Sequence, residues 1–75
     1  MRVSELMVGQ TVRVVGFLPG DKVYRQKLTA MGFTPSAVFR VLRMAPLGDP
    51  IEIEIRGTML SLRKEEANIM RIEEV

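Results

Sequence analysis

The side chains that could carry out chemistry in this 75-residue chain are few. There is no histidine and no cysteine, which removes the commonest general base near neutral pH and the thiolate nucleophile. Ser4, Ser36 and Ser61 therefore have no histidine partner that could activate them. The chain also lacks the glycine-rich loop with a Gly-Lys-Ser or Gly-Lys-Thr end that cradles a phosphate. These absences predict a protein that is not an enzyme and that binds no cofactor.

Metal binding is the remaining chemistry to consider. Ferrous iron sites in proteins usually recruit imidazole, often with a carboxylate, and this chain offers only the carboxylates. Glu52 and Glu54 alternate with isoleucines, so they project from one face of a strand roughly 7 Å apart. The pair could hold a weak site for a hard ion, and a solvated strand face is the alternative. The six methionines are scattered, as expected for flexible core fillers. We predict no tight metal site.

Charge is distributed unevenly along the sequence. Residues 1–45 hold seven Lys or Arg and two acids, a balance of +5; residues 46–75 hold four and seven, a balance of −3, giving a net charge of +2. This asymmetry predicts a basic face and an acidic face. A basic face could meet nucleic acid, anionic lipid headgroups or an acidic protein surface. Ordinary solvated charge is the alternative interpretation.

Hydrophobic patterning predicts five short strands and one helix. The residues around Ile53 alternate strictly between isoleucine and glutamate, which buries Ile53 and leaves Glu52 and Glu54 in water. Arg56 and Gly57 can form the tight turn that follows. The strands are expected at residues 11–18, 38–44, 51–55, 59–63 and 69–73, with a short turn or helical piece at 64–68.

The helix is expected at residues 22–31, between the first and second strands. Asp21 is placed to accept hydrogen bonds from its first free amides, and Gly32 follows as the residue that ends it. Lys27 lies within the apolar side of the helix, and its long stem can carry the charge out to water. At 100° per residue the apolar arc contains Val23, Tyr24, Leu28, Ala30 and Met31, whereas Arg25, Gln26 and Thr29 face away.

A sheet this small would leave unpaired edges and an open apolar face unless it closed on itself. We therefore predict a mainly β protein, a small SH3-like barrel of about five strands with one inserted α-helix, forming a single domain over residues 1–75. A small open α+β sandwich is the alternative. No apolar run approaches the roughly 20 residues that span a membrane. The first residues also lack the apolar stretch of a secretory signal, so we expect a cytoplasmic protein without direct membrane insertion.

Three segments carry a resemblance to a known family. The first is Leu6, Gly9 and Gln10 before a valine-rich strand, and the second is residues 25–35, a helix followed by a glycine turn and a proline. The third and most specific is the string Ala45-Pro46-Leu47-Gly48-Asp49-Pro50 within residues 41–51, supported by Gly57 and residues 60–63. Over nearly the whole chain, the sequence resembles the FeoA family. Ser36 stands where that family usually has glycine after the proline.

The resemblance implies an SH3-like barrel that acts beside FeoB, a membrane ferrous iron permease with a cytosolic GTP-binding domain. The expected function is that of a small cytosolic accessory protein that binds FeoB and regulates it or helps to assemble it. The protein would be a monomer or weak homo-oligomer, held near the inner face of the membrane through this partner. The alternatives are a small basic barrel that binds nucleic acid and a weak transition-metal-binding regulatory module. The few aromatic residues weigh against nucleic acid.

The partner surface is expected on the helix and on the turn after the second strand. Arg25 points to the polar side of the helix, and Leu28 is placed at the edge of its apolar arc, where it could serve both the core and a partner. The two prolines and the glycine of the turn would present Leu47 at little ordering cost. The candidate partner-binding residues are Tyr24, Arg25, Leu28, Arg43, Pro46, Leu47, Gly48, Asp49 and Pro50.

Overall fold

One two-residue turn sets the register of a strand pair in the computed structural model, which describes all residues 1–75. Arg56 and Gly57 both have positive φ, 52° and 78°, the combination that joins strands with the natural right-handed twist. They connect β3 (Ile51–Ile55) to β4 (Thr58–Leu62), with Ile55 paired to Thr58. The alternation of the β3 sequence therefore becomes an alternation of burial. Ile53 is fully buried and Glu54 is exposed, as predicted, whereas Glu52, which was also expected in water, is half-buried.

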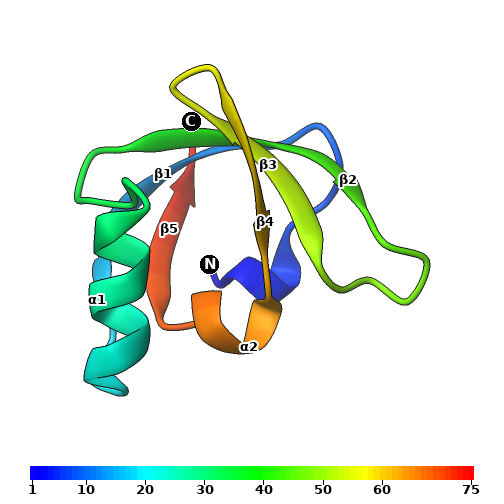
Figure 1. Cartoon of the computed structure of the whole chain (residues 1–75). Coiled ribbons are helices and arrows are strands. Elements are labelled where there is room, and N and C mark those ends of the chain that lie inside the picture. Colours follow the sequence, from blue (N-terminus) through cyan, green and yellow to red (C-terminus); the bar gives the residue numbers. More distant parts are fainter.

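The strands form one antiparallel sheet in the order β4-β3-β2-β1-β5. β1 spans Thr11–Phe17, β2 spans Val38–Met44 and β5 spans Met70–Glu74. Register shifts in β1, between Val14 and Gly16, and in β2, between Val41 and Arg43, accompany the curl of the sheet visible in Figure 1. β4 and β5 do not pair with each other, so the barrel is closed by packing and not by a complete ring of hydrogen bonds.

Two helices complete the chain. α1 (Lys22–Ala30) connects β1 to β2, where the inserted helix was predicted, and ends one residue earlier than expected. α2 (Lys64–Ala67) is a single turn that leads from β4 toward β5 across the open side of the barrel (Figure 1). Neither helix has the length and apolarity needed to span a lipid bilayer. A 3-10 turn at Val3–Glu5 packs Val3 into the interior.

Sixteen buried residues, all apolar, make up one core. Phe33 and Phe39 meet edge to face, with ring centroids 5.3 Å apart, and no buried side-chain nitrogen or oxygen lacks a hydrogen-bond partner. Every strand contributes buried side chains to the core, although β4 contributes only Leu62. From α1, only Leu28 is buried. The core thus fixes the barrel tightly and holds α1 by a narrow contact.

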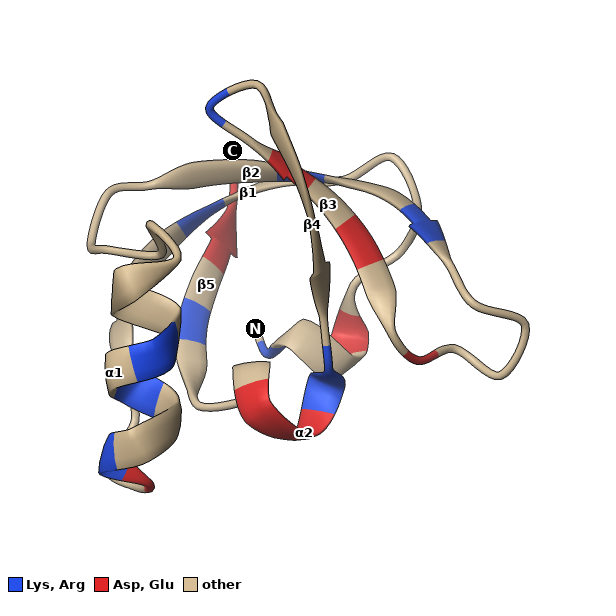
Figure 2. Ribbon diagram, in the orientation of Figure 1, with Lys and Arg blue, Asp and Glu red and all other residues tan.

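The predicted basic and acidic faces do not form, because the sheet interleaves the two halves of the chain. β1 and β2, from the basic half, lie between β3 and β5, from the acidic half (Figure 2). Every ion pair accordingly joins the two halves: Arg13 with Glu73 at 3.2 Å, Lys27 with Glu66 at 2.9 Å, and Arg43 with Glu52 at 2.6 Å. Charges that are separated along the sequence are therefore neighbours on the surface.

Candidate partner-binding surface

The first part of the candidate surface is α1, which Asp21 starts as predicted. One carboxylate oxygen of Asp21 accepts hydrogen bonds from the backbone N–H of Val23 at 2.8 Å and of Tyr24 at 3.4 Å. At the other end Gly32 has a φ of 104°, and the chain leaves the helix there. The helix is thus held by its caps and by Leu28, its only buried residue.

The predicted orientation of the α1 apolar arc is wrong. Val23 is 68% exposed and Ala30 is exposed, whereas Leu28 is 2% exposed. The helix lies against the end of the barrel and not across its open face, so one residue and the partly buried Met31 are enough to attach it. Leu28 is therefore a core residue and not the edge residue we expected, and its side chain is unavailable to a partner in this conformation.

Tyr24 and Arg25 remain at the surface of α1. Tyr24 is half-buried and Arg25 is exposed. The guanidinium carbon of Arg25 lies 5.4 Å from the centre of the Phe17 ring, at the end of β1. This cation–π contact holds the arginine in place while leaving its charge in water, where it is available to an acidic group.

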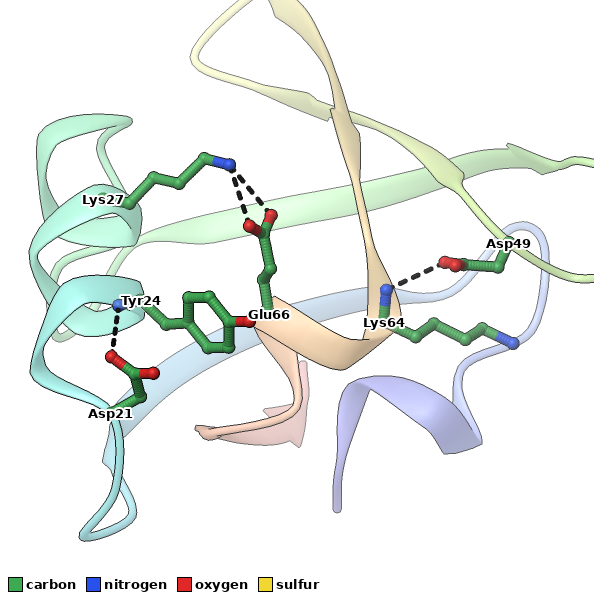
Figure 3. Close-up of polar contacts among 6 residues, drawn as sticks. All are labelled: Asp21, Tyr24, Lys27, Asp49, Lys64 and Glu66. Carbon is green, nitrogen blue, oxygen red and sulfur yellow. Dashed lines mark hydrogen bonds and ion pairs between the residues drawn. The ribbon is translucent and has the colours of Figure 1, made fainter.

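The second part of the surface is the turn Ala45–Pro50, hereafter the 45–50 turn. Its ends are tied together, because the Ala45 N–H donates to the Pro50 carbonyl at 3.0 Å and the Gly48 N–H donates to the Ala45 carbonyl at 2.7 Å. Asp49 fixes the turn to α2, since its carboxylate accepts from the backbone N–H of Lys64 at 2.8 Å (Figure 3). Leu47 is 96% exposed on this braced turn, the most exposed large apolar side chain in the chain.

Figure 1 places α1 and the 45–50 turn on opposite sides of the molecule, so they do not form one continuous patch. A groove of about 170 Å³ lies between α1 on one side and β4 and α2 on the other. Lys27 and Glu66 bridge this groove, with the lysine ammonium 2.9 and 3.0 Å from the two carboxylate oxygens (Figure 3). Of the predicted site residues only Leu28 and Pro50 line it, and Arg43, Pro46 and Pro50 border a separate depression beside β2.

Comparison with known proteins decides the family. A model of the FeoA domain matches residues 1–74. The chain belongs to the FeoA family. It is 36% identical, over 73 residues, to the Fe(2+) transport protein A/Fe(2+) transporter FeoB fusion protein of Porphyromonas gingivalis. That alignment covers 97% of this chain and 8% of the fusion protein. The FeoA family is linked to ferrous iron transport and is a family of small transport-associated domains, not a known enzyme family.

Solved FeoA structures share the fold. The NMR structure of a FeoA-like protein from Clostridium acetobutylicum superposes with a TM-score of 0.90 at 36% identity, covering 100% of this chain and 86% of that one. FeoA from Stenotrophomonas maltophilia, solved as a complex with zinc and described as an SH3 domain protein, gives a TM-score of 0.81 at 22% identity, covering 97% and 89%. The predictions of the FeoA family and of an SH3-like barrel are confirmed.

Sequence reasoning missed most of the groove in this FeoA protein. The missed lining residues belong to α1, β4, α2 and the residues that cap the two helices: Lys27, Met31, Ser61, Leu62, Arg63 and Glu66. The one feature of the sequence that pointed to this groove was the position of Lys27 within the predicted apolar arc. Lys27 is exposed, and its ammonium group contacts Glu66, a partner 39 residues away. A single sequence does not reveal a pairing of that separation.

Glu52 and Glu54, the candidate pair for a hard ion, each have a basic residue as a neighbour. The Glu52 carboxylate accepts from the Arg43 side chain at 2.6 Å, and Glu54 lies opposite Arg40 across the β2–β3 pair (Figure 2). An ion at Glu52 and Glu54 would have to displace the first of these contacts and approach two cationic side chains. No group of three or more His, Cys, Asp or Glu side chains is placed to hold a metal ion.

Proposed function

We propose that this FeoA protein is a non-catalytic accessory protein that binds the cytosolic side of the ferrous iron permease FeoB and regulates it or helps to assemble it. The observation that carries the proposal is the P. gingivalis relative, in which one chain is named as both transport protein A and transporter FeoB. A covalent link raises the effective concentration of two modules toward the millimolar range and favours even a weak contact between them. A separate FeoA chain must supply that contact through its own surface.

The 45–50 turn is the surface that favours a protein partner most clearly. Its hydrogen bonds and the Asp49 contact with α2 brace the backbone before binding, so little conformational entropy remains to be lost. Leu47 then offers a large apolar side chain to a pocket on the partner. We place the association in the cytoplasm, at the inner face of the membrane.

Arg25 would make a second, electrostatic contribution. Its charge is exposed but held over Phe17, so it can attract an acidic partner surface as the proteins approach. Exposed charges are screened over about 8 Å at physiological ionic strength. Its effect should therefore fall mainly on the association rate and fade with added salt.

Binding to the full-length permease in nanodiscs tests the proposal. We expect Leu47→Gln to weaken binding by about tenfold or more, which corresponds to about 1.4 kcal/mol, through faster dissociation. Arg25→Glu should slow association at low salt. Val8→Gln is the matched control, because Val8 is also an exposed apolar residue, 59% exposed, outside both candidate surfaces; its binding should stay within about twofold of wild type.

Two results would overturn different parts of the proposal. Absence of saturable binding by the wild-type protein at concentrations up to about 100 μM, weaker than about −5.5 kcal/mol, would reject the accessory function. Folded Leu47→Gln and Arg25→Glu variants that bind as well as wild type would reject the surface but not the function. Leu28→Gln is unsuitable here, because Leu28 is buried and its loss would act through stability.

A further inference from the structure

The 45–50 turn supplies a cap for a helix that does not adjoin it in the sequence. α2 begins after Arg63, whose backbone has the extended conformation of a cap residue but whose side chain makes no capping hydrogen bond. The Asp49 carboxylate takes this role from 15 positions away, because it accepts from the backbone N–H of Lys64, the first residue of α2, at 2.8 Å (Figure 3). The start of α2 therefore depends on the turn.

The other end of α2 is anchored separately. Ala67 is fully buried in the core, and the side-chain oxygen of Asn68 accepts from the backbone N–H of Ser4 at 3.2 Å. Within this four-residue helix, the Ala67 N–H donates to the Arg63 carbonyl and the Asn68 N–H to the Lys64 carbonyl, both at 2.9 Å. So short a helix is not stable by itself, and contacts with other segments decide where its side chains lie.

Glu66, the third residue of α2, holds α1. Its carboxylate oxygens lie 2.9 and 3.0 Å from the Lys27 ammonium, and Tyr24 also extends from α1 toward α2 (Figure 3). The Glu66 side chain is 24% exposed, so water and salt screen this pair less than a fully exposed one. The core otherwise attaches α1 through Leu28, its only buried residue, and the partly buried Met31 that follows it. An element with so few buried contacts opens locally at a low cost in free energy.

We propose that α2 couples the 45–50 turn to α1. Asp49 fixes the start of α2, α2 places Glu66, and Glu66 holds α1 through Lys27. The two candidate partner surfaces thus communicate although they lie on opposite sides of the molecule (Figure 1). A partner that drew Asp49 away from Lys64 would loosen α1, and because coupling is reciprocal, displacement of α1 would loosen the contact of the turn with α2. The inference concerns the free protein and does not require the function proposed above.

Amide hydrogen exchange in the isolated protein, read by NMR, tests the coupling. The backbone N–H groups of Arg25 and Met31 donate to the carbonyls of Asp21 and Lys27, so they exchange when α1 opens. Asp49→Ala should speed the exchange of both amides by about threefold or more, the size expected for loss of a partly exposed ion pair. Asp49 is distant from both amides in the sequence, so the substitution does not alter their intrinsic exchange rates.

Two references separate the opening of α1 from a general loss of stability. The N–H groups of Val14 and Val41 donate to the carbonyls of Ala37 and Gln10 and report the opening of the sheet. Their exchange should rise by a smaller factor than that of the α1 amides. Leu47→Ala is the matched control variant, because Leu47 lies on the same turn, is 96% exposed and takes part in none of its hydrogen bonds. It should leave the exchange of α1 within about twofold of wild type.

A second substitution tests whether α2 carries the effect. Arg63 is exposed, belongs to no ion pair and already has the backbone conformation of a cap residue. Arg63→Ser would therefore give α2 a capping side chain of its own. In the double variant Asp49→Ala/Arg63→Ser, the exchange of α1 should return to within about twofold of wild type, although the turn still lacks its contact with α2.

The reverse direction gives a readout that does not depend on the folding of Asp49→Ala. Lys27→Met removes the charge that holds Glu66, and it should speed the exchange of the Lys64 N–H, which donates to Asp49, by about threefold or more. Lys22→Met is the matched control, because Lys22 is an exposed lysine of α1 with no ion pair. That variant should leave the exchange of the Lys64 amide within about twofold of wild type.

Three results would overturn the coupling. Equal increases at α1 and at the two sheet amides would show that Asp49→Ala weakens the whole domain. Unchanged exchange of α1 in folded Asp49→Ala, or faster exchange that Arg63→Ser does not reverse, would mean that α2 transmits nothing from the turn. Unchanged exchange of the Lys64 amide in folded Lys27→Met would contradict the reverse direction. None of these measurements uses FeoB, so their failure leaves the accessory function to its own binding test.

Discussion

Single residues in this FeoA protein differ sharply in how much they contribute to stability, and two adjacent residues of β3 show the contrast. Ile53 is completely buried and pairs with Val41 and Leu60 on the flanking strands. Glu54, one residue later, is exposed and takes part in no ion pair. The same backbone therefore carries a side chain on which the core depends and one that water solvates.

The first prediction follows from this contrast and concerns the stability of two β3 variants. Ile53→Ala should lower the free energy of unfolding by about 2–5 kcal/mol, because it removes buried methyl groups and leaves a cavity. Glu54→Ala should lower it by about 0.5 kcal/mol or less. Urea denaturation of both variants measures the difference, and equal losses would mean that the register of β3 is wrong.

Ser36 stands where the family resemblance predicts glycine, and the backbone conformation at this position is one that favours glycine. Its φ is 75°, so the turn keeps the left-handed conformation that glycine adopts freely, and the departure in sequence does not change it. Ser36 is exposed, which leaves no packing to compensate. The fold therefore tolerates a strained residue here, of a type that costs roughly 1–2 kcal/mol.

Relief of this strain is the second prediction. Ser36→Gly should raise the free energy of unfolding by up to about 1 kcal/mol, the relieved strain being partly offset by the greater freedom of glycine in the unfolded chain. Ser36→Val should lower it, because a β-branched residue is least compatible with positive φ. Thermal melts of the two variants that shift in the same direction would contradict this account.

At the scale of the elements, the strands could be predicted from the sequence, but the way in which α1 packs against the barrel could not. The ranges of β2 and β3 follow from the sequence, because β-branched and alternating residues end at evident turns. For α1 the periodicity indicated a broad buried face, whereas packing buries only Leu28. A helix that caps the end of a small barrel touches it over a narrow area, and hydrophobic periodicity carries no information about that area.

The candidate site was also only partly predictable from the sequence. The exposure of Leu47 in the 45–50 turn agrees with the turn chemistry of its sequence. The groove does not follow from any local pattern, since it joins α1 to β4 and α2 through contacts between distant positions. The unpaired outer edge of β4 likewise follows only from the order of the strands in the sheet.

Because α1 has a narrow contact with the core, its caps should matter, and this is the third prediction. Asp21→Ala removes the acceptor for two amides of the first turn and should lower the free energy of unfolding by roughly 0.5–2 kcal/mol. Lys22→Ala is the matched control, as an exposed neighbour with no ion pair. Equal melting temperatures for the two variants would show that α1 does not depend on its cap.

At the scale of the molecule, interleaving the two halves of the chain distributes charge evenly. β1 and β2 bring their arginines between the acidic strands β3 and β5, so the sequence asymmetry leaves no broad basic surface. A nucleic-acid binder needs such a surface, because phosphate contacts supply most of its nonspecific affinity. The basic residues that no ion pair uses are spread along the chain: Arg2, Lys22, Arg25, Arg40, Arg56, Arg63, Lys64 and Arg71.

The fourth prediction follows from this distribution. A fluorescently labelled 20-base single strand or duplex should not bind detectably at physiological salt and protein concentrations up to about 10 μM, since nonspecific binding by basic proteins falls near 1–100 μM. Fluorescence anisotropy is the measurement. A dissociation constant below about 1 μM that weakens steeply with salt would restore nucleic acid as a partner.

The pairing of β1 with β5, the last strand of the chain, also affects when this protein can fold during its synthesis. β1 pairs with β5, whose residues are made about 60 positions later, and at 5–20 residues per second that interval lasts roughly 3–12 s. During it, Val12 and Val14 belong to a nascent chain that has no finished sheet to receive them. The last strand to be synthesised therefore completes the barrel, so folding must follow synthesis of the domain and cannot proceed strand by strand with it.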